Sequence, residues 1–319
     1  MNNQEAKKLE AKVTKQLKKH LSPTDTVIAA ISGGPDSIFL LNSLKKIPCK
    51  IVVAHIDHGL RKESKAEAKF VQKQSPIFEL KTANIKKLSQ KLKKGLEEVG
   101  REVRYKFFAE LAKKYKAKYI ITAHHADDNL ETIIFNFARG ATLQGLLGIS
   151  EVEPTTKTNT KLLRPLIDIS KAQILDYLKF KKIPYKTDKS NDDLIYKRNF
   201  IRHKIVPLLK ELNPSLTTTL ATNIQNLREI RDFLKTSAEN FLKTQQTLDA
   251  KLFRQQHPAL QKEILLTVYK NLVKNTLNLK SINLDETLNL INKNIGNKSK
   301  KLGQLTVKIL NNKILFSIH

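Results

Sequence analysis

The first half of the chain alternates short, continuous apolar runs with longer stretches in which apolar residues recur every three or four positions. Continuous runs of this length are typical of strands that are buried on both faces. Strands are expected at residues 26–31, 50–54, 76–80 and 118–123. Helices are expected at residues 4–20, from 38 onward, at 97–115 and at 127–138. The alternation predicts an α/β fold with a parallel sheet sandwiched by helices.

Beyond Pro207 the alternation ends, and amphipathic stretches follow one another without apolar runs between them. Helices are expected through residues 220–234 and at residues 258–273 and 284–295. The last segment, residues 304–318, predicts a β-hairpin that turns at Asn311 and Asn312.

This change of pattern predicts two domains. The first, residues 1–208, holds the alternating pattern, and its Thr-rich stretch 151–160 is expected to be a polar loop. The second, residues 209–319, is smaller and mostly helical. No window approaches the run of about 18 apolar residues that a membrane span requires. The Lys-rich start is unlike a signal peptide, so a cytoplasmic protein without a membrane segment is expected.

Charge narrows the choice of partners. The net charge is +28 and is spread over the whole chain, which indicates a polyanionic partner such as nucleic acid. A codon bias toward Lys, Asn and Ile is the alternative explanation. Arginine is scarce, with 10 residues against 48 lysines, yet seven arginines lie between residues 61 and 202. This clustering favours bidentate contacts with phosphate, carboxylate or a base edge.

The most informative motif directly follows the first expected strand. It consists of Ser32, Gly33, Gly34, Pro35, Asp36 and Ser37. The two glycines let backbone amides approach phosphate oxygens, the two serines add hydroxyl donors, and the next helix directs its positive end to the same place. A carboxylate beside phosphates is unfavourable without a cation, so Asp36 is a predicted Mg²⁺ ligand. The motif lacks the lysine and the spacing of a Walker loop.

Polar residues also follow the second expected strand. They are His55, Asp57, His58 and Arg61. At the carboxyl end of a strand such side chains would line a nucleotide cleft. Hydrogen bonding is the expected role, because a zinc site through the two histidines lacks further obvious ligands. A helix cap is the alternative role for Asp57.

A second cluster follows the fourth expected strand and contains His124, Asp127, Asp128 and Glu131. Their spacing would place His124, Asp128 and Glu131 on one helix face. A cluster of carboxylates that faces the loop of Asp36 would complete a Mg²⁺ site. For one of the two aspartates, the alternative is simply a favourable negative charge at a helix N-terminus.

Arginine-bearing segments supply further candidates. Glu97, Arg101 and Arg104 are expected on one helix face, where an exposed ion pair would have the same spacing. Residues 188–203 combine a polar loop with a basic helix that suits contact with a phosphate backbone. A capped surface helix is the alternative for this segment.

Taken together, these ordered motifs resemble the PP-loop ATP pyrophosphatases and, among them, the tRNA(Ile)-lysidine synthases. The resemblance rests on residues 32–37, 55–61, 97–105, 122–132, 139–148, 164–166 and 188–202. The chain departs from the family pattern near Gly95, and Glu98 replaces a small residue. The helical region and hairpin resemble the family's C-terminal domain loosely. The chain is expected to stop before the further C-terminal domain of longer members.

The resemblance implies an ATP- and Mg²⁺-dependent ligase that joins L-lysine to C2 of the wobble cytidine of tRNA(Ile) with a CAU anticodon. ATP would adenylate the C2 oxygen, and the lysine amine would then displace AMP. The product, lysidine, pairs with A, so that decoding switches from AUG to AUA and charging from Met to Ile. Residues 209–319 would bind tRNA, and the sequence is compatible with a homodimer.

The resemblance also implies a role for each candidate residue. ATP would be bound by Ser32, Gly33, Gly34, Pro35, Asp36, Ser37, His55 and Asp57. The catalytic residues would be Asp36, His124, Asp128, Glu131, Arg101 and Arg104, with Mg²⁺ on Asp36 and Asp128. Substrate or tRNA would be bound by Arg61, Glu97, Arg139, Arg164, Arg198 and Arg202.

Three other functions are alternatives to this one. A tRNA thiolase with the same loop would need reactive cysteines, and the one cysteine, Cys49, stands at the start of an apolar strand. An amidotransferase-type synthetase would need an ammonia source, and no segment resembles a glutaminase. A non-catalytic RNA-binding protein would have no use for Asp36, Asp128 and Glu131.

Overall fold

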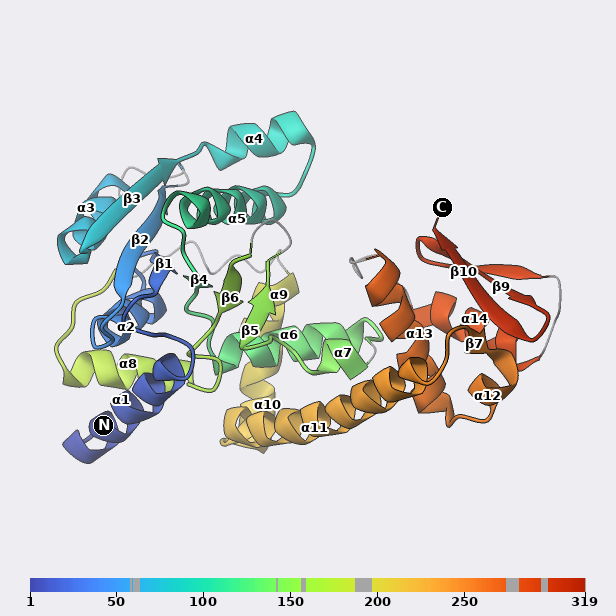
Figure 1. Ribbon diagram of the computed structural model, residues 1–319. Helices are drawn as coiled ribbons and strands as arrows, with labels where there is room; N and C mark the ends of the chain where they lie inside the picture. Colours follow the sequence, from blue (N-terminus) through green and yellow to red (C-terminus); the bar gives the residue numbers. More distant parts are fainter. Residues whose placement is uncertain are drawn as a thin grey trace. The chain divides into compact units, whose positions relative to one another are not determined.

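The computed structural model describes most of the chain (Figure 1). The described residues are 1–57, 59, 64–141, 143–155, 159–186, 197–273, 281–293 and 298–318. Within these residues the chain forms a six-stranded sheet, a four-stranded sheet and the helices around them. None of the helices in these ranges is long and apolar enough to cross a membrane.

The larger sheet has the strand order β3-β2-β1-β4-β6-β5. Its strands are β1 (Thr26–Ala30), β2 (Lys50–Asp57), β3 (Ile77–Thr82), β4 (Tyr119–Ile121), β5 (Val152–Pro154) and β6 (Lys161–Leu163). All neighbours run parallel except β5, which pairs antiparallel with β6 at the edge. The carboxyl ends of the parallel strands therefore meet at one edge of the sheet, which is where ligands bind in sheets of this kind.

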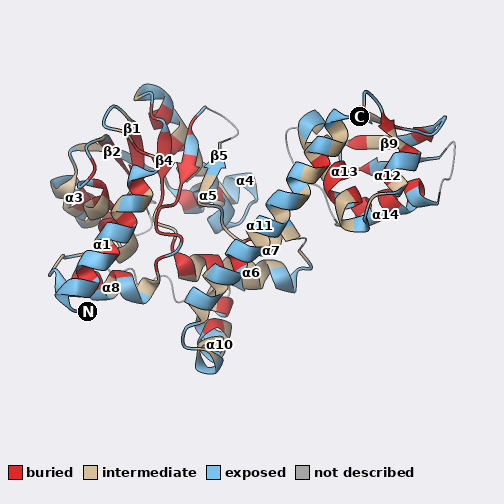
Figure 2. Cartoon of the chain, turned by 60° about the horizontal axis from the view of Figure 1, so that its bottom comes forward, coloured by how far each residue is buried: buried red, intermediate tan, exposed pale blue. Residues whose placement is uncertain are grey.

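Helices cover both faces of this sheet, as predicted. In chain order the helices up to residue 180 are α1 (Asn3–Lys18), α2 (Pro35–Leu44), α3 (Ser64–Gln74), α4 (Ile85–Leu92), α5 (Leu96–Lys114), α6 (Ala126–Ala138), α7 (Leu143–Leu146) and α8 (Lys171–Phe180). Alternate residues of β1 serve the two faces: Val27 and Ala29 pack with the α1, α2 and α8 layer, whereas Ile28 packs with α5. Figure 2 shows buried residues in β1, β2 and β4 and also along the helices.

The chain then continues through an almost unbroken series of helices. They are α9 (Lys197–Phe200), the π-helix η2 (Ile201–Ile205), α10 (Val206–Leu212), α11 (Leu216–Lys243), α12 (Ala250–Arg254), α13 (Pro258–Val273) and α14 (Ser281–Asn292). Leu130 of α6 packs against Ile201 and Val206 in a small apolar cluster. This cluster fixes the π-helix and α10 on α6, the helix that carries the predicted acidic residues.

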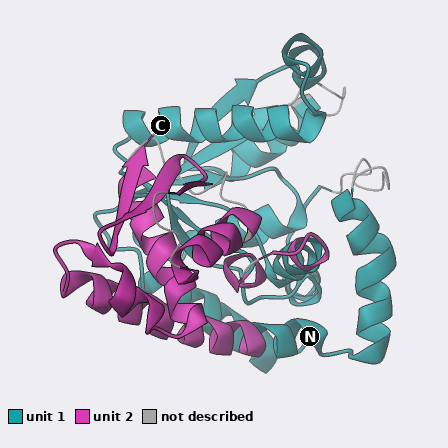
Figure 3. Ribbon diagram, turned by 90° about the vertical axis from the view of Figure 1, so that its right-hand side faces the viewer, with its two compact units in different colours: residues 1–135, 148–221 teal, residues 136–147, 222–319 magenta. Residues whose placement is uncertain are grey.

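The contacts divide the chain into two compact units (Figure 3). The first contains residues 1–135 and 148–221, and the second contains residues 136–147 and 222–319. The predicted division between residues 208 and 209 falls within α10, inside the first unit.

The second unit has its own core and its own sheet. The strands β7 (Leu248–Asp249), β8 (Ser299–Leu302), β9 (Leu305–Leu310) and β10 (Lys313–Ile318) form an antiparallel sheet in the order β7-β10-β9-β8. Phe253 and Tyr269 are fully buried in the core beside it. The predicted hairpin is confirmed as β9 and β10, which turn at Asn311 and Asn312, both with positive φ.

Short strands account for the differences from the sequence-based prediction. The stretch 151–160, predicted as a polar loop, begins with the edge strand β5, and β6 follows it. Each of these strands is three residues long, so neither gives a measurable apolar period. In the second unit, β8 has the sequence Ser-Lys-Lys-Leu and is recognisable as a strand only through its pairing with β9.

A partly exposed charge network joins α1 to the layer formed by α2 and α8. The Glu10 carboxylate binds Lys46 Nζ at 2.8 Å and Lys181 Nζ at 3.3 Å, and it accepts a hydrogen bond from Tyr177 Oη at 2.6 Å. Burial raises the pKa of Glu10, but the hydrogen bonds from these three partners outweigh it and lower the pKa to about 2.

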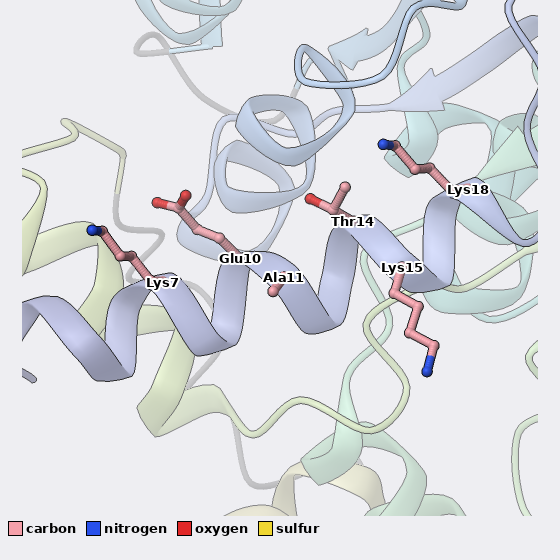
Figure 4. Close-up of a pocket in the computed structure, with 6 residues that line it drawn as sticks. All are labelled: Lys7, Glu10, Ala11, Thr14, Lys15 and Lys18. Atoms are coloured by element: carbon pink, nitrogen blue, oxygen red, sulfur yellow. The ribbon is translucent and has the colours of Figure 1, made fainter.

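A groove of about 550 Å³ lies along α1, and Figure 4 shows the residues that line it. It is lined by Lys7, Glu10, Ala11, Thr14, Lys15 and Lys18. All six residues belong to α1, and none of them is a predicted site residue. The groove is therefore a feature of the packing of α1 and does not lie among the candidate functional residues.

The Glu10 network makes a testable contribution to stability. Because folding lowers the pKa of Glu10 from 4.5 to about 2, its stabilisation is complete above pH 4.5 and is lost as the pH falls toward 2. We expect Glu10→Gln to lower the free energy of unfolding at pH 7 by about 1–3 kcal/mol. In urea unfolding, the difference from wild type should shrink steadily between pH 4.5 and 2.

The exposed acid Asp176 on α8 provides the matched control, and Asp176→Asn should change the free energy of unfolding by less than about 0.5 kcal/mol. An effect of Glu10→Gln that did not depend on pH would contradict the ionic interpretation.

Candidate active site

The loop after β1 is a tight turn held by its own serines. Gly33 has φ +95°, and a Cβ there would lie 3.2 Å from Val71 Cγ2, so glycine is required. Gly33 N–H donates to Ser37 Oγ at 3.0 Å, and Gly34 N–H donates to Ser32 Oγ at 3.3 Å. The Ser37 hydroxyl donates in turn to the Gly34 carbonyl at 2.9 Å. The serines therefore shape the turn in which the two glycine amides lie.

The helix that follows presents its positive end at this turn. Pro35 occupies the first helical position of α2, where its missing N–H costs nothing. The Gly34 cap makes no side-chain hydrogen bond, so the first amides of α2 belong to the set that a helix leaves for ligands or water. Asp36 lies in this first turn, which makes the end of the helix suitable for a phosphate only when the carboxylate is neutralised.

A lysine from a distant element neutralises Asp36. Lys171 Nζ lies 2.7 Å from both Asp36 carboxylate oxygens. Lys171 is the first residue of α8, and its backbone N–H donates to Asp127 Oδ2 at 2.7 Å. One residue thus joins the loop of Asp36 to the acidic start of α6.

His125 lies in the middle of the acidic residues and is buried. Its Nε2 is 3.8 Å from Asp36 Oδ2 and 3.4 Å from Asp128 Oδ2, and its Nδ1 is 3.8 Å from Asp127 Oδ2. The His125 backbone N–H also donates to Asp128 Oδ2 at 3.0 Å. Asp36 and Asp128 therefore both lie within 4 Å of one imidazole nitrogen, and their shared role as Mg²⁺ ligands stays a prediction.

Arg202, in the π-helix, binds two of the acidic residues. Its Nε and Nη2 bind the two oxygens of Glu131 at 2.6 and 3.0 Å, and Nη2 also lies 3.2 Å from Asp128 Oδ1. Glu131 is buried, and burial raises its pKa although Arg202 opposes the shift. A π-helical turn often marks a functional site, and here it carries the guanidinium that bridges the two carboxylates.

Asp127 has a structural role next to the cluster. Besides the Lys171 N–H, it accepts a hydrogen bond from Lys210 Nζ of α10 at 2.7 Å. Burial raises the pKa of Asp127, but these two hydrogen bonds hold it below its usual range. Asp127 therefore stays ionised and ties α8 and α10 to the start of α6.

The structure corrects the prediction for His124. The helix begins at Ala126, so His124 precedes it and does not share a helix face with Asp128 and Glu131. Its Nδ1 lies 2.8 Å from Thr122 Oγ1. Burial lowers the pKa of His124 to about 4, against the opposing effect of Asp128 and with help from Arg164, Arg101 and Arg104. The imidazole is therefore neutral at physiological pH.

Two arginines of α5 act on His124 through their charge. Arg101 Cζ lies 4.8 Å from the centre of the Tyr105 ring, and Arg104 Nε donates to the Gly100 carbonyl at 3.3 Å. Both arginines and Glu97 are exposed. They form a solvent-facing side of the site from which a large anionic substrate could be contacted.

Arg164 and His55 are buried instead. Arg164 Nη1 donates to the Ser150 carbonyl at 2.6 Å, and Nη2 binds Glu153 at 2.8 Å. His55 Nδ1 donates to the Ile31 carbonyl at 2.8 Å and so braces the end of β1. The contacts of both residues are with the protein itself, and their predicted ligand contacts stay predictions.

The remaining predicted residues lie farther apart. Asp57 accepts a hydrogen bond from Gly59 N–H at 2.8 Å, and Arg198 Nη2 lies 3.4 Å from Thr132 Oγ1. Arg139 belongs to the second unit. Outside the described residues are His58, Arg61 and the polar loop at 188–191.

Sequence reasoning missed three residues of the cluster, namely His125, Lys171 and Lys210. His125 directly follows His124, and the sequence does not show which of the two faces the acids, because this depends on the exact start of α6. Lys171 and Lys210 are separated from their partners by 135 and 83 residues, and a lysine-rich chain gives no signal that distinguishes them.

The donor set fits a phosphate-bound Mg²⁺ ion. Among the residues that the structure describes, no group of three or more His, Cys, Asp and Glu side chains is arranged to hold a metal. Mg²⁺ requires less, because it keeps several waters and commonly takes one or two carboxylates together with substrate phosphates. Asp36 and Asp128 can supply such oxygens if Lys171 and Arg202 each release one.

Comparison with known families identifies the family of the chain. The model of the PP-loop domain matches residues 5–209. The chain belongs to the PP-loop family. A solved PP-loop-like structure, the U34-tRNA thiolase NcsA from Methanococcus maripaludis with its 4Fe-4S cluster, covers 70% of this chain and 79% of its own, with a TM-score of 0.57 and 18% identity. At this identity the likeness concerns the fold alone.

Curated relatives of this PP-loop chain carry a more specific name. The tRNA(Ile)-lysidine synthase of Porphyromonas gingivalis is 38% identical over 68% of this chain and 48% of its own length. That of Thermosipho africanus is 37% identical over 67% of this chain and 51% of its own length. The chain spans about half the length of these relatives.

The environment of His124 gives a direct prediction. We expect its imidazole to titrate near pH 4 and not near 6.5, as followed by its ring chemical shifts in NMR spectra. Arg101→Gln should raise this pKa, because it removes one of the positive charges that disfavour the imidazolium ion. His124→Gln identifies the signal, and a pKa near 6.5 in the wild type would show that the ring is solvated.

Proposed function

We propose that this protein is a tRNA(Ile)-lysidine synthase, which uses ATP to join L-lysine to C2 of the wobble cytidine of tRNA(Ile) with a CAU anticodon. The observation that supports this most strongly is the pairing of the PP-loop turn with a cluster of carboxylates held by Lys171 and Arg202. Binding of ATP phosphates alone would require only the PP-loop turn. The additional acidic cluster suits a second substrate that carries an ammonium group, as lysine does.

In the first step the C2 oxygen of cytidine attacks the α-phosphorus of ATP, and the bond to the β-phosphate breaks, so pyrophosphate leaves. This converts C2–O into a good leaving group. The α2 amides and the turn of Gly33 and Gly34 would hold the phosphates. Mg²⁺ on Asp36 and Asp128 would neutralise charge on the departing pyrophosphate.

In the second step the lysine ε-amine attacks C2, and AMP leaves with the former C2 oxygen. The ammonium form of lysine must first lose a proton. A group with a pKa near 4 is a weak base, so we assign His124 to accepting a hydrogen bond and not to removing this proton. Glu131 is the better acceptor, because burial raises its pKa above that of an ordinary carboxylate.

Arg202 would have a second task in this step. It holds Glu131 and Asp128 in place while the site lacks lysine. An incoming amino acid carries both an ammonium and a carboxylate, so it can take the acidic partners of Arg202 and offer Arg202 a carboxylate in exchange. The ion pairs formed with lysine would then replace those that Arg202 gives up, so the free-energy cost of lysine binding stays low.

The tRNA would contact exposed cationic residues. Arg101 and Arg104 lie on the solvent side of the site, and the excess of lysine gives the long-range attraction that nucleic acid requires. We propose that residues 209–319 contribute to tRNA binding as well. An enzyme with this substrate would work in the cytoplasm.

A sulfur-transfer function receives no such support. Cys49 is the single cysteine of the chain and is half-buried. Burial raises the pKa of its thiol, with a further contribution from Asp25, so the reactive thiolate is disfavoured.

Incorporation of radiolabelled lysine into RNA tests the proposal. With ATP present, label should enter a tRNA(Ile) transcript with a CAU anticodon and not the same transcript with a GAU anticodon. Asp36→Asn should lower incorporation by about 100-fold or more, because it removes a ligand of the Mg²⁺ ion that would balance the phosphate charge.

The exposed acid of α8 again serves as the control, and Asp176→Asn should leave incorporation unchanged. Absence of label from every CAU-anticodon tRNA with the wild-type protein would overturn the proposed function.

A further inference from the structure

We propose that Lys171 is the lysine that binds the β- and γ-phosphates of ATP and that it moves to them from Asp36 when the nucleotide enters. This inference rests on the proposed use of ATP and deepens it, because it assigns a triphosphate-sensing residue that the PP-loop motif itself lacks. A Walker loop carries its lysine within the motif, whereas the turn at residues 32–37 contains none.

The position of Lys171 is fixed at its backbone. Ser170 caps α8 through a capping box with Gln173, and the Lys171 N–H donates to the Asp127 carboxylate at 2.7 Å. From this fixed origin the side chain extends to Asp36, where Nζ lies 2.7 Å from both oxygens. The lysine side chain is 34% exposed, so its ammonium group is accessible to an incoming ligand.

The charge of Asp36 explains why the ammonium would change partners. Without a counter-charge, this carboxylate in the first turn of α2 would repel a triphosphate. Lys171 neutralises it in the ligand-free protein. If Mg²⁺ and phosphates arrive together and Asp36 turns an oxygen to the metal, the nearest anion available to the ammonium group is the phosphate chain.

In the ligand-free protein the neighbouring cations contact groups other than Asp36. Lys210 binds Asp127, and Arg202 binds Glu131 and Asp128. Lys186 donates its backbone N–H to the Gly33 carbonyl at 2.9 Å, but its ammonium lies 5.5 Å from the centre of the Phe70 ring. Lys171 is therefore the described lysine that the structure places directly on the acid of the phosphate loop.

A purely structural role is the competing explanation. Lys171 could serve only to neutralise Asp36 and to hold α8 against α2. In that case its loss would affect all adenine nucleotides alike, and removing the Asp36 charge as well would make Lys171 unnecessary. A role on the phosphates predicts the opposite in both respects.

Nucleotide binding without tRNA or lysine separates the two roles. In calorimetric titrations with Mg²⁺, Lys171→Met should weaken ATP binding by about 10- to 100-fold, the range expected for hydrogen bonds to a charged partner, and leave AMP binding unchanged. The exposed lysine of the same helix gives the control, and Lys179→Met should leave both affinities unchanged. Equal losses for ATP and AMP, or no loss, would overturn the inference.

A second measurement compares ATP affinities in the presence of EDTA, so that no metal ion contributes to binding. Asp36→Asn eliminates the carboxylate charge, and Lys171→Met is then added to it. The double variant should bind ATP about 10-fold or more weakly than Asp36→Asn alone. Equal ATP affinities of these two variants would show that Lys171 only balances Asp36.

The outcome for the wild type keeps this test separate from the proposed function. ATP binding by the wild type that Lys171→Met does not change would remove the role of Lys171 and leave lysidine formation standing. Failure of the wild type to bind ATP with Mg²⁺ would remove both.

Discussion

The pairing of carboxylates with cations at the carboxyl edge of the larger sheet is the interaction on which the rest of the site depends. Four acids, Asp36, Asp127, Asp128 and Glu131, meet around the buried ring of His125 or directly beside it. Carboxylates placed so close together destabilise a fold unless each has a partner. The partners come from α8, the π-helix and α10, so the ion pairs hold these elements against the start of α6 and the loop of Asp36.

The same pairing explains how a site made of acids can accept an anion. In the ligand-free protein, Lys171 and Arg202 complete the charge balance. In the proposed reaction, ATP with Mg²⁺ and lysine would bring charges of both signs, so binding would exchange one set of ion pairs for another. The hydrogen bonds from Lys171 and Lys210 hold the pKa of Asp127 below its usual range, so this acid stays ionised although it is half-buried.

Sequence patterns predicted what local spacing determines and missed what tertiary contacts determine. The turn at residues 32–37, the parallel strands and the pair Asp128 and Glu131 follow from short-range rules, and the structure contains all of them. The prediction that His124 shares a helix face with Asp128 and Glu131 was wrong because His124 lies two positions before the first residue of α6. Lys171 could not be found because its partner is 135 residues away. The strands β5 and β6 are too short to give a periodic signal.

The position at which ATP is cleaved decides whether the proposed reaction is correct. The measurement that tests this most directly is a ³¹P NMR time course of the full chain with ATP, Mg²⁺, lysine and a tRNA(Ile) with a CAU anticodon. Cleavage between the α- and β-phosphates predicts AMP and pyrophosphate in equal amounts, formed only when the tRNA is present. The appearance of ADP and inorganic phosphate as the primary products would contradict the assignment of the turn, the carboxylates and their cations to this reaction.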